Sequence, residues 1–198
     1  RFLIERGCRV AAFEPSPKRR EFLLSRDFAQ NDNFIGVVDG SGDETFDVVI
    51  AAEVIEHVLD EGLESVVARL HRFLNPEGKL IITTPNNEDL ELGSAYCPVS
   101  DTVFHRWQHM RSFTAESLDD LLSARGFIRL EDHRVDFSSY AALHEKYLKL
   151  EHEANYLRKL GPVYPLLAPF LPKPHIQQQA GNLRIGAQTS LIYVGRAV

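Results

Sequence analysis

The stretch FDVVIAAEVIEHV, residues 46–58, decides the fold of this chain. Its first part, residues 46–52, is apolar at almost every position, so we expect a strand that is buried on both faces, as in the middle of a parallel sheet. Acidic and imidazole side chains follow directly after this strand. In open α/β sheets, ligands bind outside the carboxyl ends of the strands. The stretch therefore predicts a central strand with one edge of a binding site at its end.

Strand-like and helix-like segments alternate on both sides of this stretch. Residues 1–6 indicate the end of a helix that Gly7 terminates, and Ser16 with Pro17 is typical of a helix start. The expected strands cover residues 9–13, 34–38, 79–84, 128–135 and 189–194, and the expected helices cover residues 16–25, 63–74 and 114–126. This alternation predicts an α/β fold with a parallel sheet.

Four segments fall outside this alternation. Residues 75–78, NPEG, are expected to form a turn. Residues 86–112 lack periodicity and are expected to form a long loop, of a kind that is often functional. Residues 138–160 predict a long, charged, amphipathic helix, and half of the ten prolines then fall in residues 162–174. That proline-rich segment is a candidate lid, dimer contact or membrane-surface contact, or a loop that packs on its own core.

The composition is that of a globular protein. Of the 198 residues, 44% are hydrophobic and 25% are charged, and the net charge is −6. These values exclude a disordered or fibrous chain, and the acidic balance argues against non-specific nucleic-acid binding. No segment approaches the roughly 20 apolar residues of a membrane-spanning helix. Cys8 and Cys97 do not make a disulfide framework, so we expect a reducing compartment and a cytoplasmic location.

Four motifs in a fixed order identify a family. They are RVAAFE (residues 9–14), FDVVIAAEVIEHV, LNPEGKLIITTPN (residues 74–86) and HMRSFTAESLDDLLSARGF (residues 109–127). In this order they resemble the class I S-adenosylmethionine-dependent methyltransferases. The resemblance implies a Rossmann-like α/β sheet with helices on both faces and an antiparallel last strand. It also implies S-adenosylmethionine as the cofactor and methyl transfer as the reaction.

The family's first strand and its glycine-rich loop have no counterpart in this sequence. The chain begins with Arg1, and its single methionine is Met110. We therefore expect roughly 30 or more residues upstream, about one βα unit, and a gap between the strands at residues 9–13 and 46–52. Gly40 and Gly42 form the sole G-x-G, which lacks a third glycine and predicts a turn.

The resemblance places cofactor contacts at the ends of three expected strands. Glu14 follows the first strand and is expected to accept hydrogen bonds from the ribose hydroxyls. Asp39 is a candidate for the adenine amino group or, with similar weight, a turn residue before Gly40. The backbone of Ala52, Glu53 and Val54 is expected to lie beside the cofactor. Glu53 has a second interpretation, as an acid at a helix N-terminus.

Imidazole side chains mark the methyl-acceptor side. His57 and His109 are candidate general bases because imidazole titrates near neutrality. His105 and Trp107 are expected to form a substrate-facing wall, or else Trp107 is buried and pins the loop. Cys97 with His105 is too few for a closed structural zinc site.

A metal site is a weaker interpretation of the same region. If a helix begins near Glu53, then Glu53, Glu56 and His57 share one face and could bind a divalent cation. This E-x-x-E-H spacing resembles that of the small-RNA 3′-terminal 2′-O-methyltransferases, which also supply a later histidine. The same string occurs in methyltransferases that need no metal, so we predict no metal site.

We thus expect one methyltransferase domain over residues 1–198. Its loop at 86–112 and the helix with the proline-rich insertion at 138–188 are expected to shape the site of the methyl acceptor. That acceptor is expected to be a small molecule, a sugar, or a lipid or quinone, without nucleic acid and with a homodimer left open. Two alternatives remain: a metal-assisted RNA 2′-O-methyltransferase, and a non-catalytic interaction module.

Overall fold

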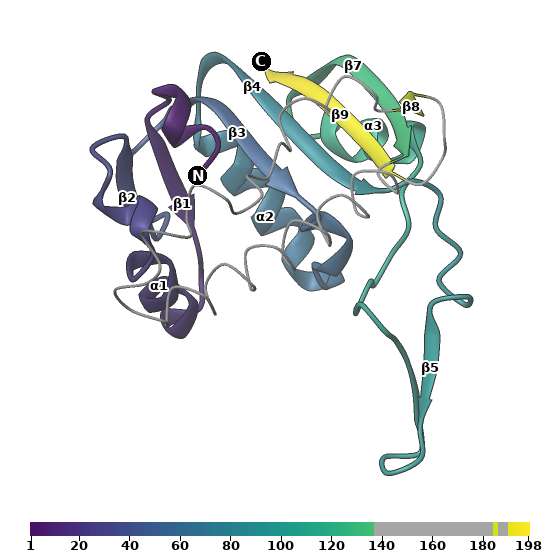
Figure 1. Cartoon of the computed structure of the whole chain (residues 1–198). Helices are drawn as coiled ribbons and strands as arrows, with labels where there is room; N and C mark the ends of the chain where they lie inside the picture. The colour runs from purple at the N-terminus through teal and green to yellow at the C-terminus, as the bar shows by residue number, and fades with distance from the viewer. Residues whose placement is uncertain (137–183, 186–189) are drawn as a thin grey trace, which may run out of the picture.

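The computed structural model of this chain describes residues 1–136, 184–185 and 190–198 (Figure 1). Its largest sheet has five strands, in the spatial order β3 (Phe46–Ala52), β4 (Leu74–Pro85), β9 (Ser190–Ala197), β7 (Phe127–Asp136) and β8 (Arg184–Ile185). β3 and β4 are parallel, whereas β9 is antiparallel to both of its neighbours. The predicted α/β sheet with an antiparallel last strand is therefore confirmed.

The two N-terminal strands form a separate parallel pair, β1 (Val10–Phe13) and β2 (Phe34–Val38). The 3-10 helix η1 (Ile4–Arg6) precedes them and ends at Gly7, whose φ of 82° is left-handed. Helix α1 (Pro17–Leu24) and the 3-10 helix η2 (Asp27–Gln30) connect the two strands. The expected gap between β1 and β3 is thus present, since the two strands belong to different sheets.

Among the described residues, β3 lies at an edge of the five-stranded sheet, as the expected gap to β1 requires, so it is not buried on both faces as its apolar run alone predicts. Val48 and Ile50 are 46% and 50% exposed. The bounds of β3 follow from its apolar run. Its burial depends on neighbours on both sides, and in the described part of the chain β3 pairs with β4 alone.

Two element boundaries also differ from the prediction. Helix α2 spans Asp60–Arg72, and β4 begins already at Leu74. The NPEG segment that was expected to form a turn is therefore part of β4, where pairing with β3 jumps from Phe46–Leu74 to Val48–Lys79. Glu77 takes a left-handed φ of 65° at this irregularity. The turn-forming residues of NPEG thus mark a bulge within a strand and not a turn between two elements.

Helices α2 and α3 (Ala115–Ser123) pack on one face of the sheet. The buried residues alternate along β4 and β9, as expected for strands with one face in the core. The core cluster joins residues of both helices and both strands: Val67, Leu118, Leu122, Leu80, Ile82, Leu191 and Tyr193. This rigid layer fixes the carboxyl ends of β3 and β4, where the candidate site lies.

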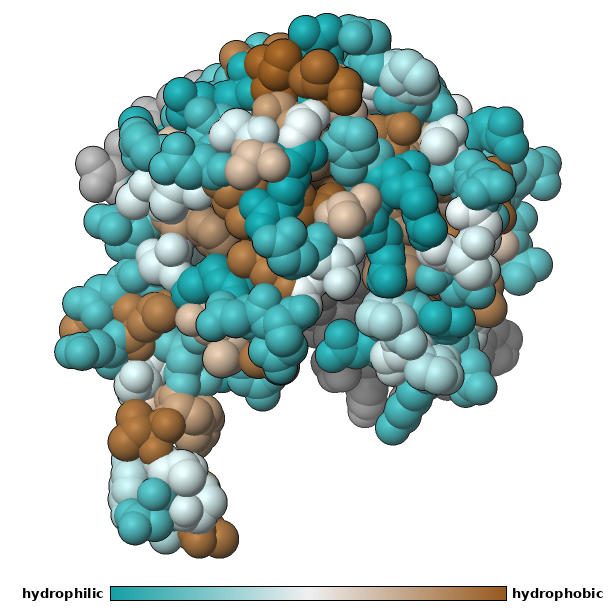
Figure 2. All heavy atoms as spheres, turned by 180° about the vertical axis from the view of Figure 1, so that it is seen from behind, coloured by the Kyte–Doolittle hydropathy of each residue, from teal (hydrophilic) through white to brown (hydrophobic). Residues whose placement is uncertain are grey.

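The segment expected as a loop at 86–112 contains an antiparallel hairpin, β5 (Ser94–Cys97) with β6 (Thr102–His105). In Figure 1 the hairpin projects away from the sheets, and from behind it is the protrusion with brown side chains at the lower left of Figure 2. Its exposed apolar residues include Tyr96, Val99 and Val103. The prediction missed it because each strand has only four residues, too few for a clear period of two.

The predictions for residues 138–160, 162–174 and most of 138–188 lie outside the described residues; within that last range, residues 184 and 185 form β8. Across the described ranges, no helix has the length and apolar character that crossing a membrane requires.

The start of α3 is fixed by a capping box. The Thr114 hydroxyl accepts a hydrogen bond from the Ser117 backbone N–H, and the Ser117 hydroxyl accepts one from the Thr114 N–H. We expect Thr114→Ala to lower the free energy of unfolding by about 1 kcal/mol. Chemical denaturation checks this, with Thr114→Ser as the control that keeps the capping oxygen. Equal losses in both variants would contradict the capping role.

Candidate functional site

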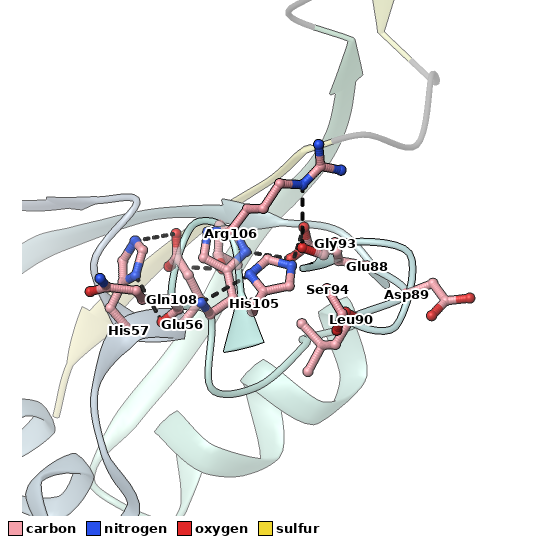
Figure 3. A network of polar contacts seen from close by, with 12 residues as sticks. Glu56, His57, Glu88, Asp89, Leu90, Gly93, Ser94, His105, Arg106 and Gln108 are labelled. Atoms are coloured by element: carbon pink, nitrogen blue, oxygen red, sulfur yellow. Dashed lines mark hydrogen bonds and ion pairs between the residues drawn. The ribbon is translucent and has the colours of Figure 1, made fainter. Parts of the chain in front are cut away.

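The candidate site forms where the segment after β3 meets the segment before α3. The 3-10 helix η3 (Ile55–His57) follows β3, and three contacts tie it to residues 108–111. The Met110 N–H donates to the Glu56 carbonyl at 2.8 Å, and the Arg111 guanidinium donates to the Ile55 carbonyl at 3.3 Å. The third contact joins the His57 ring to the Gln108 carbonyl. Hydrogen bonds thus join two segments about fifty residues apart in sequence (Figure 3).

The structure brings the four predicted aromatic residues of the acceptor side together. The His109 ring stacks on His105 at a centroid distance of 4.7 Å and meets the His57 ring edge-on at 4.8 Å. Trp107 lies 5.6 Å from His105 and 6.2 Å from His109. Trp107 is 57% exposed, so the interpretation in which its burial pins the loop is wrong.

Glu56 is the buried acid of the site, with only 1% of its surface exposed. Burial raises the pKa of its carboxyl, and the neighbouring Glu53 adds to the rise, while hydrogen bonds, including one from Thr84, oppose it. The Thr84 hydroxyl donates to Oε2 at 3.1 Å. Oε1 has no hydrogen-bond partner among the described residues and faces His57 Nε2 at 3.9 Å.

The proton on His57 can be assigned from its partner. A carbonyl oxygen accepts only, so the contact of 3.2 Å between His57 Nδ1 and the Gln108 carbonyl requires a proton on Nδ1. In the neutral ring, Nε2 then carries a lone pair. This lone pair and Glu56 Oε1 face each other with no donor between them. Two acceptors that face each other repel, so a shared proton or a cation between His57 Nε2 and Glu56 Oε1 would stabilise the pair.

One atom each from Glu56, His57 and His109 lie within 4.8 Å of one another. A carboxylate with two imidazoles is a donor set that suits divalent metal ions. Glu53 does not join them, because the expected helix at Glu53 does not form: α2 begins at Asp60, and the Glu53 carboxylate instead accepts from the Thr83 hydroxyl at 2.7 Å. Two of the three residues named by the spacing argument, Glu56 and His57, thus lie together with His109 at a spacing that fits a cation.

Backbone strain gathers around this cluster. Non-glycine residues rarely take a positive φ, yet Glu53, Asn87 and Gln108 do so, at 51°, 50° and 61°. Each adjoins a segment that carries a site residue: Glu53 precedes η3, Asn87 precedes Glu88 and Gln108 precedes His109. Such strain persists only where the surrounding structure enforces it and often accompanies a functional site.

Glu88 is a site residue that no sequence motif indicates. Its carboxylate contacts the His109 ring through Oε2 and lies 3.7 Å from His105 Nε2 through Oε1. Glu88 follows β4 without any motif of its own. The one signal that could have found it is its place, three residues after the end of a strand whose carboxyl end faces the site.

The residues predicted to hold the cofactor lie outside this imidazole cluster. Glu14 follows β1 and is partly buried, and its Oε1 accepts from the Ser16 N–H at 2.8 Å. Asp39 accepts from both the N–H and the hydroxyl of Ser41, and these bonds lower the pKa of its carboxyl. This is the geometry of a turn. Residues 52–54 are exposed at the end of β3.

Sequence comparison identifies the domain. The profile described as "Methyltransferase domain" matches residues 1–131. The ubiquinone biosynthesis O-methyltransferase of Bos taurus, a mitochondrial enzyme, is 36% identical over 89 residues, which are 42% of this chain and 23% of that enzyme. The enzyme of the same name from Azorhizobium caulinodans is 33% identical over 90 residues, 42% of this chain and 34% of its own. The chain thus matches no more than about a third of these curated relatives.

Comparison of folds gives the same answer. The chain superimposes on a Burkholderia thailandensis 1,6-didemethyltoxoflavin-N1-methyltransferase, solved with 1,6-didemethyltoxoflavin and S-adenosylhomocysteine, with a TM-score of 0.55 and 15% identity over 100% of this chain and 64% of that one. A Haemonchus contortus phosphoethanolamine N-methyltransferase 2, solved with S-adenosyl-L-methionine, gives a TM-score of 0.55 and 19% identity over 98% of this chain and 44% of that one. From its profile match and its Rossmann-like sheet, the chain belongs to the methyltransferase domain family, with the fold of the class I S-adenosylmethionine-dependent enzymes.

Proposed function

We propose that this chain transfers the methyl group of S-adenosylmethionine to an oxygen or nitrogen of a small-molecule, sugar, or lipid or quinone acceptor. The observation that carries this is the imidazole cluster of His57, His105 and His109 at the carboxyl ends of β3 and β4 in a methyltransferase domain. The names of the curated relatives support a quinone-type acceptor only coarsely.

Methyl transfer requires mainly that the protein aligns the acceptor with the methyl group of the cofactor. The sulfonium already activates the methyl group, so the acceptor attacks in line, the carbon–sulfur bond breaks and S-adenosylhomocysteine leaves. An acceptor hydroxyl loses its proton in this step, and His109 or His57 takes that proton as general base. His105 and the exposed Trp107 form the wall against which the acceptor lies.

On the cofactor side we assign Glu14 to the ribose hydroxyls, Asp39 to the adenine amino group, and residues 52–54 to the wall beside the cofactor. We expect Glu14→Ala to weaken S-adenosylhomocysteine binding about tenfold or more, because a hydrogen bond to a charged group contributes about 1.5–3 kcal/mol. Calorimetry on the full-length protein measures this. Glu21→Ala, an exposed acid on α1, is the matched control. If both variants bind like the wild type, Glu14 does not hold the ribose.

The same calorimetry tests the function as a whole. Binding of S-adenosylhomocysteine, together with methyl transfer from S-adenosylmethionine to an acceptor in a separate activity assay, supports the enzyme. A full-length protein that binds neither S-adenosylmethionine nor S-adenosylhomocysteine would instead be a methyltransferase-like interaction module.

A second candidate is a metal-assisted O-methyltransferase, and the approach of Glu56, His57 and His109 to within 4.8 Å favours it. A bound divalent cation supplies Lewis-acid polarisation of the acceptor oxygen. Glu56, His57 and His109 would hold it. The RNA 2′-hydroxyl is the acceptor to test for this candidate, although a net charge of −6 counts against a polyanion.

Metal removal separates the two candidates. For the metal-free base mechanism we expect no Mg, Mn, Co or Zn in active protein and full activity in a chelator. Elemental analysis of the purified protein and assays before and after chelation measure this. Activity that is lost in chelator and restored by one added cation would establish the metal-assisted mechanism instead.

A further inference from the structure

We infer that Glu88 is a positioning residue that locks His109 in the tautomer with its proton on Nδ1, so that Nε2 is the nitrogen that serves the methyl acceptor. This inference rests on the proposed function for its catalytic consequence, but the tautomer itself is a property of the protein alone. Glu88 has no motif and no assigned role, and its geometry gives it one.

The first step concerns His105, whose tautomer is fixed by the backbone. The His109 backbone N–H donates to His105 Nδ1 at 3.1 Å, so Nδ1 carries a lone pair. The neutral His105 ring must then hold its proton on Nε2. That nitrogen is buried, has no hydrogen-bond partner among the described residues and lies 3.7 Å from Glu88 Oε1. The Nε2 proton of His105 thus faces one oxygen of the Glu88 carboxylate.

The second step concerns His109. Its Nδ1 lies in hydrogen-bond contact with the other oxygen, Glu88 Oε2. An ionised carboxylate only accepts hydrogen bonds, so His109 Nδ1 is the donor. The carboxylate of Glu88 therefore accepts the His109 N–H at Oε2, while the His105 N–H faces Oε1 at 3.7 Å, beyond hydrogen-bond distance. The lone pair of His109 is left on Nε2, and His109 also contributes to the cluster with Glu56 and His57.

The third step shows that this arrangement is held in place. Glu88 follows Asn87, whose left-handed turn is fixed by an N–H bond of 2.7 Å to the Phe113 carbonyl. His105 packs on Gly93, where an added Cβ would lie 1.8 Å from His105 Nε2. The side chains of Glu88, His105 and His109 are 19%, 7% and 9% exposed. Water therefore competes little for the hydrogen bond between Glu88 and His109 and for the contact of Glu88 with His105, two residues that Figure 3 labels.

Glu88, His105 and His109 also place ligand atoms within 4.8 Å of one another, which is a spacing that metals use. Tautomer chemistry argues against a metal there. A cation on His105 Nε2 would need that nitrogen unprotonated, while Nδ1 already accepts the His109 N–H. The ring would then be an imidazolate. The three side chains form a carboxylate clamp on two imidazoles, comparable to the outer carboxylates that orient catalytic and metal-bound histidines elsewhere.

Glutamine at position 88 is the decisive substitution because its shape is conserved and its hydrogen bonding is not. The amide keeps one accepting oxygen but replaces the other with a donating nitrogen, so it satisfies one imidazole N–H and opposes the second. Aspartate keeps both accepting oxygens on a side chain that is shorter by one methylene. Glu91→Gln is the matched control, an exposed acid three residues away.

The experiment combines nitrogen NMR with kinetics on the full-length protein. Spectra of ¹⁵N-histidine protein at a pH of about 8, above the ordinary pKa of imidazole of about 6.5, report which nitrogen of each ring is protonated. His109→Gln assigns the His109 signals among the eight histidines. We expect a proton on Nδ1 of His109 in the wild type. In Glu88→Gln we expect a changed tautomer population at His105 or His109 and a kcat lower by about 10- to 100-fold, with the KM for S-adenosylmethionine unchanged. Glu88→Asp should recover part of kcat.

Two results would overturn the inference: a wild-type His109 that carries its proton on Nε2, or a Glu88→Gln protein whose spectra and kcat match those of Glu91→Gln. The proposed function fails separately, if the wild type neither binds S-adenosylhomocysteine nor transfers methyl groups. In that case the NMR result still decides whether Glu88 sets the tautomer. If Glu88→Gln does not fold, the wild-type spectrum alone decides it.

Discussion

His109→Gln is expected to lower kcat by about 10²- to 10⁴-fold, the range for loss of a positioned general acid or base. Its ring meets His57 at 4.8 Å and shares the cluster with Glu56, so it belongs to both candidate mechanisms, as base or as metal ligand. Glutamine is uncharged and close in size, but it has no nitrogen lone pair to accept a proton. We therefore expect kcat to fall while binding of S-adenosylhomocysteine remains at the wild-type level.

A matched histidine elsewhere controls for loss of an imidazole as such. His133 lies on β7, where its side chain is 42% exposed and contacts Glu131. His133→Gln should leave kcat unchanged. Calorimetry with S-adenosylhomocysteine and steady-state kinetics on both variants measure the difference. A His109→Gln enzyme with wild-type kcat would remove His109 from the reaction and leave His57 as the imidazole that acts.

The local elements were predictable where a single stretch carries its own signal. β2 and β3 have the predicted bounds, because apolar β-branched and aromatic runs between polar residues specify strands by themselves. The start of α3 follows in the same way from the hydroxyl of Thr114. The order of these elements also sufficed for the fold family, since the motifs of the class I methyltransferases lie at element ends.

Pairing between distant segments was not predictable in the same way. The apolar residues of β3 are those of a central strand, and its place at an edge among the described residues follows only from the expected gap beside it, not from residues 46–52 themselves. The NPEG segment contains strong turn residues, but pairing with β3 at Leu74 before it and at Lys79 after it carries β4 through the segment. Tertiary pairing overrides local turn preference here.

The residues of the candidate site also differ in how far the sequence predicts them. His57 and His109 could be named because their residue type near a strand end or before a capped helix already suggests chemistry. Glu53 was grouped with Glu56 and His57 through an assumed helix, but a left-handed φ of 51° at Glu53 turns the chain before η3. Glu88 could not be chosen, because its contacts depend on the turn at Asn87 and on the hairpin that returns His105 to Gly93.

Ile82→Ala is expected to lower the free energy of unfolding by about 2–5 kcal/mol, the usual range for truncation of a buried isoleucine. Ile82 is fully buried in the middle of β4, with Ala51 of β3 and Tyr193 of β9 as its cross-strand partners. Truncation removes three carbon atoms from a packed layer between strands that are held by hydrogen bonds, so the layer can close the cavity only in part. Since small domains have about 5–15 kcal/mol of stability in total, this one change would remove a large share.

Ile128→Ala is the matched control, because Ile128 lies on β7 of the same sheet but is 44% exposed. It loses the same atoms without opening a closed cavity, so we expect a loss well below that of Ile82→Ala. Urea denaturation of both variants gives the two free energies. The site adds a second readout, since Thr84 stands two residues beyond Ile82 and donates the hydrogen bond that orients the buried Glu56. If β4 is the rigid base of the site, Ile82→Ala should lower kcat as well as stability. Equal stability losses in both variants would mean that the packing around Ile82 adjusts and that β4 does not hold Glu56 in place.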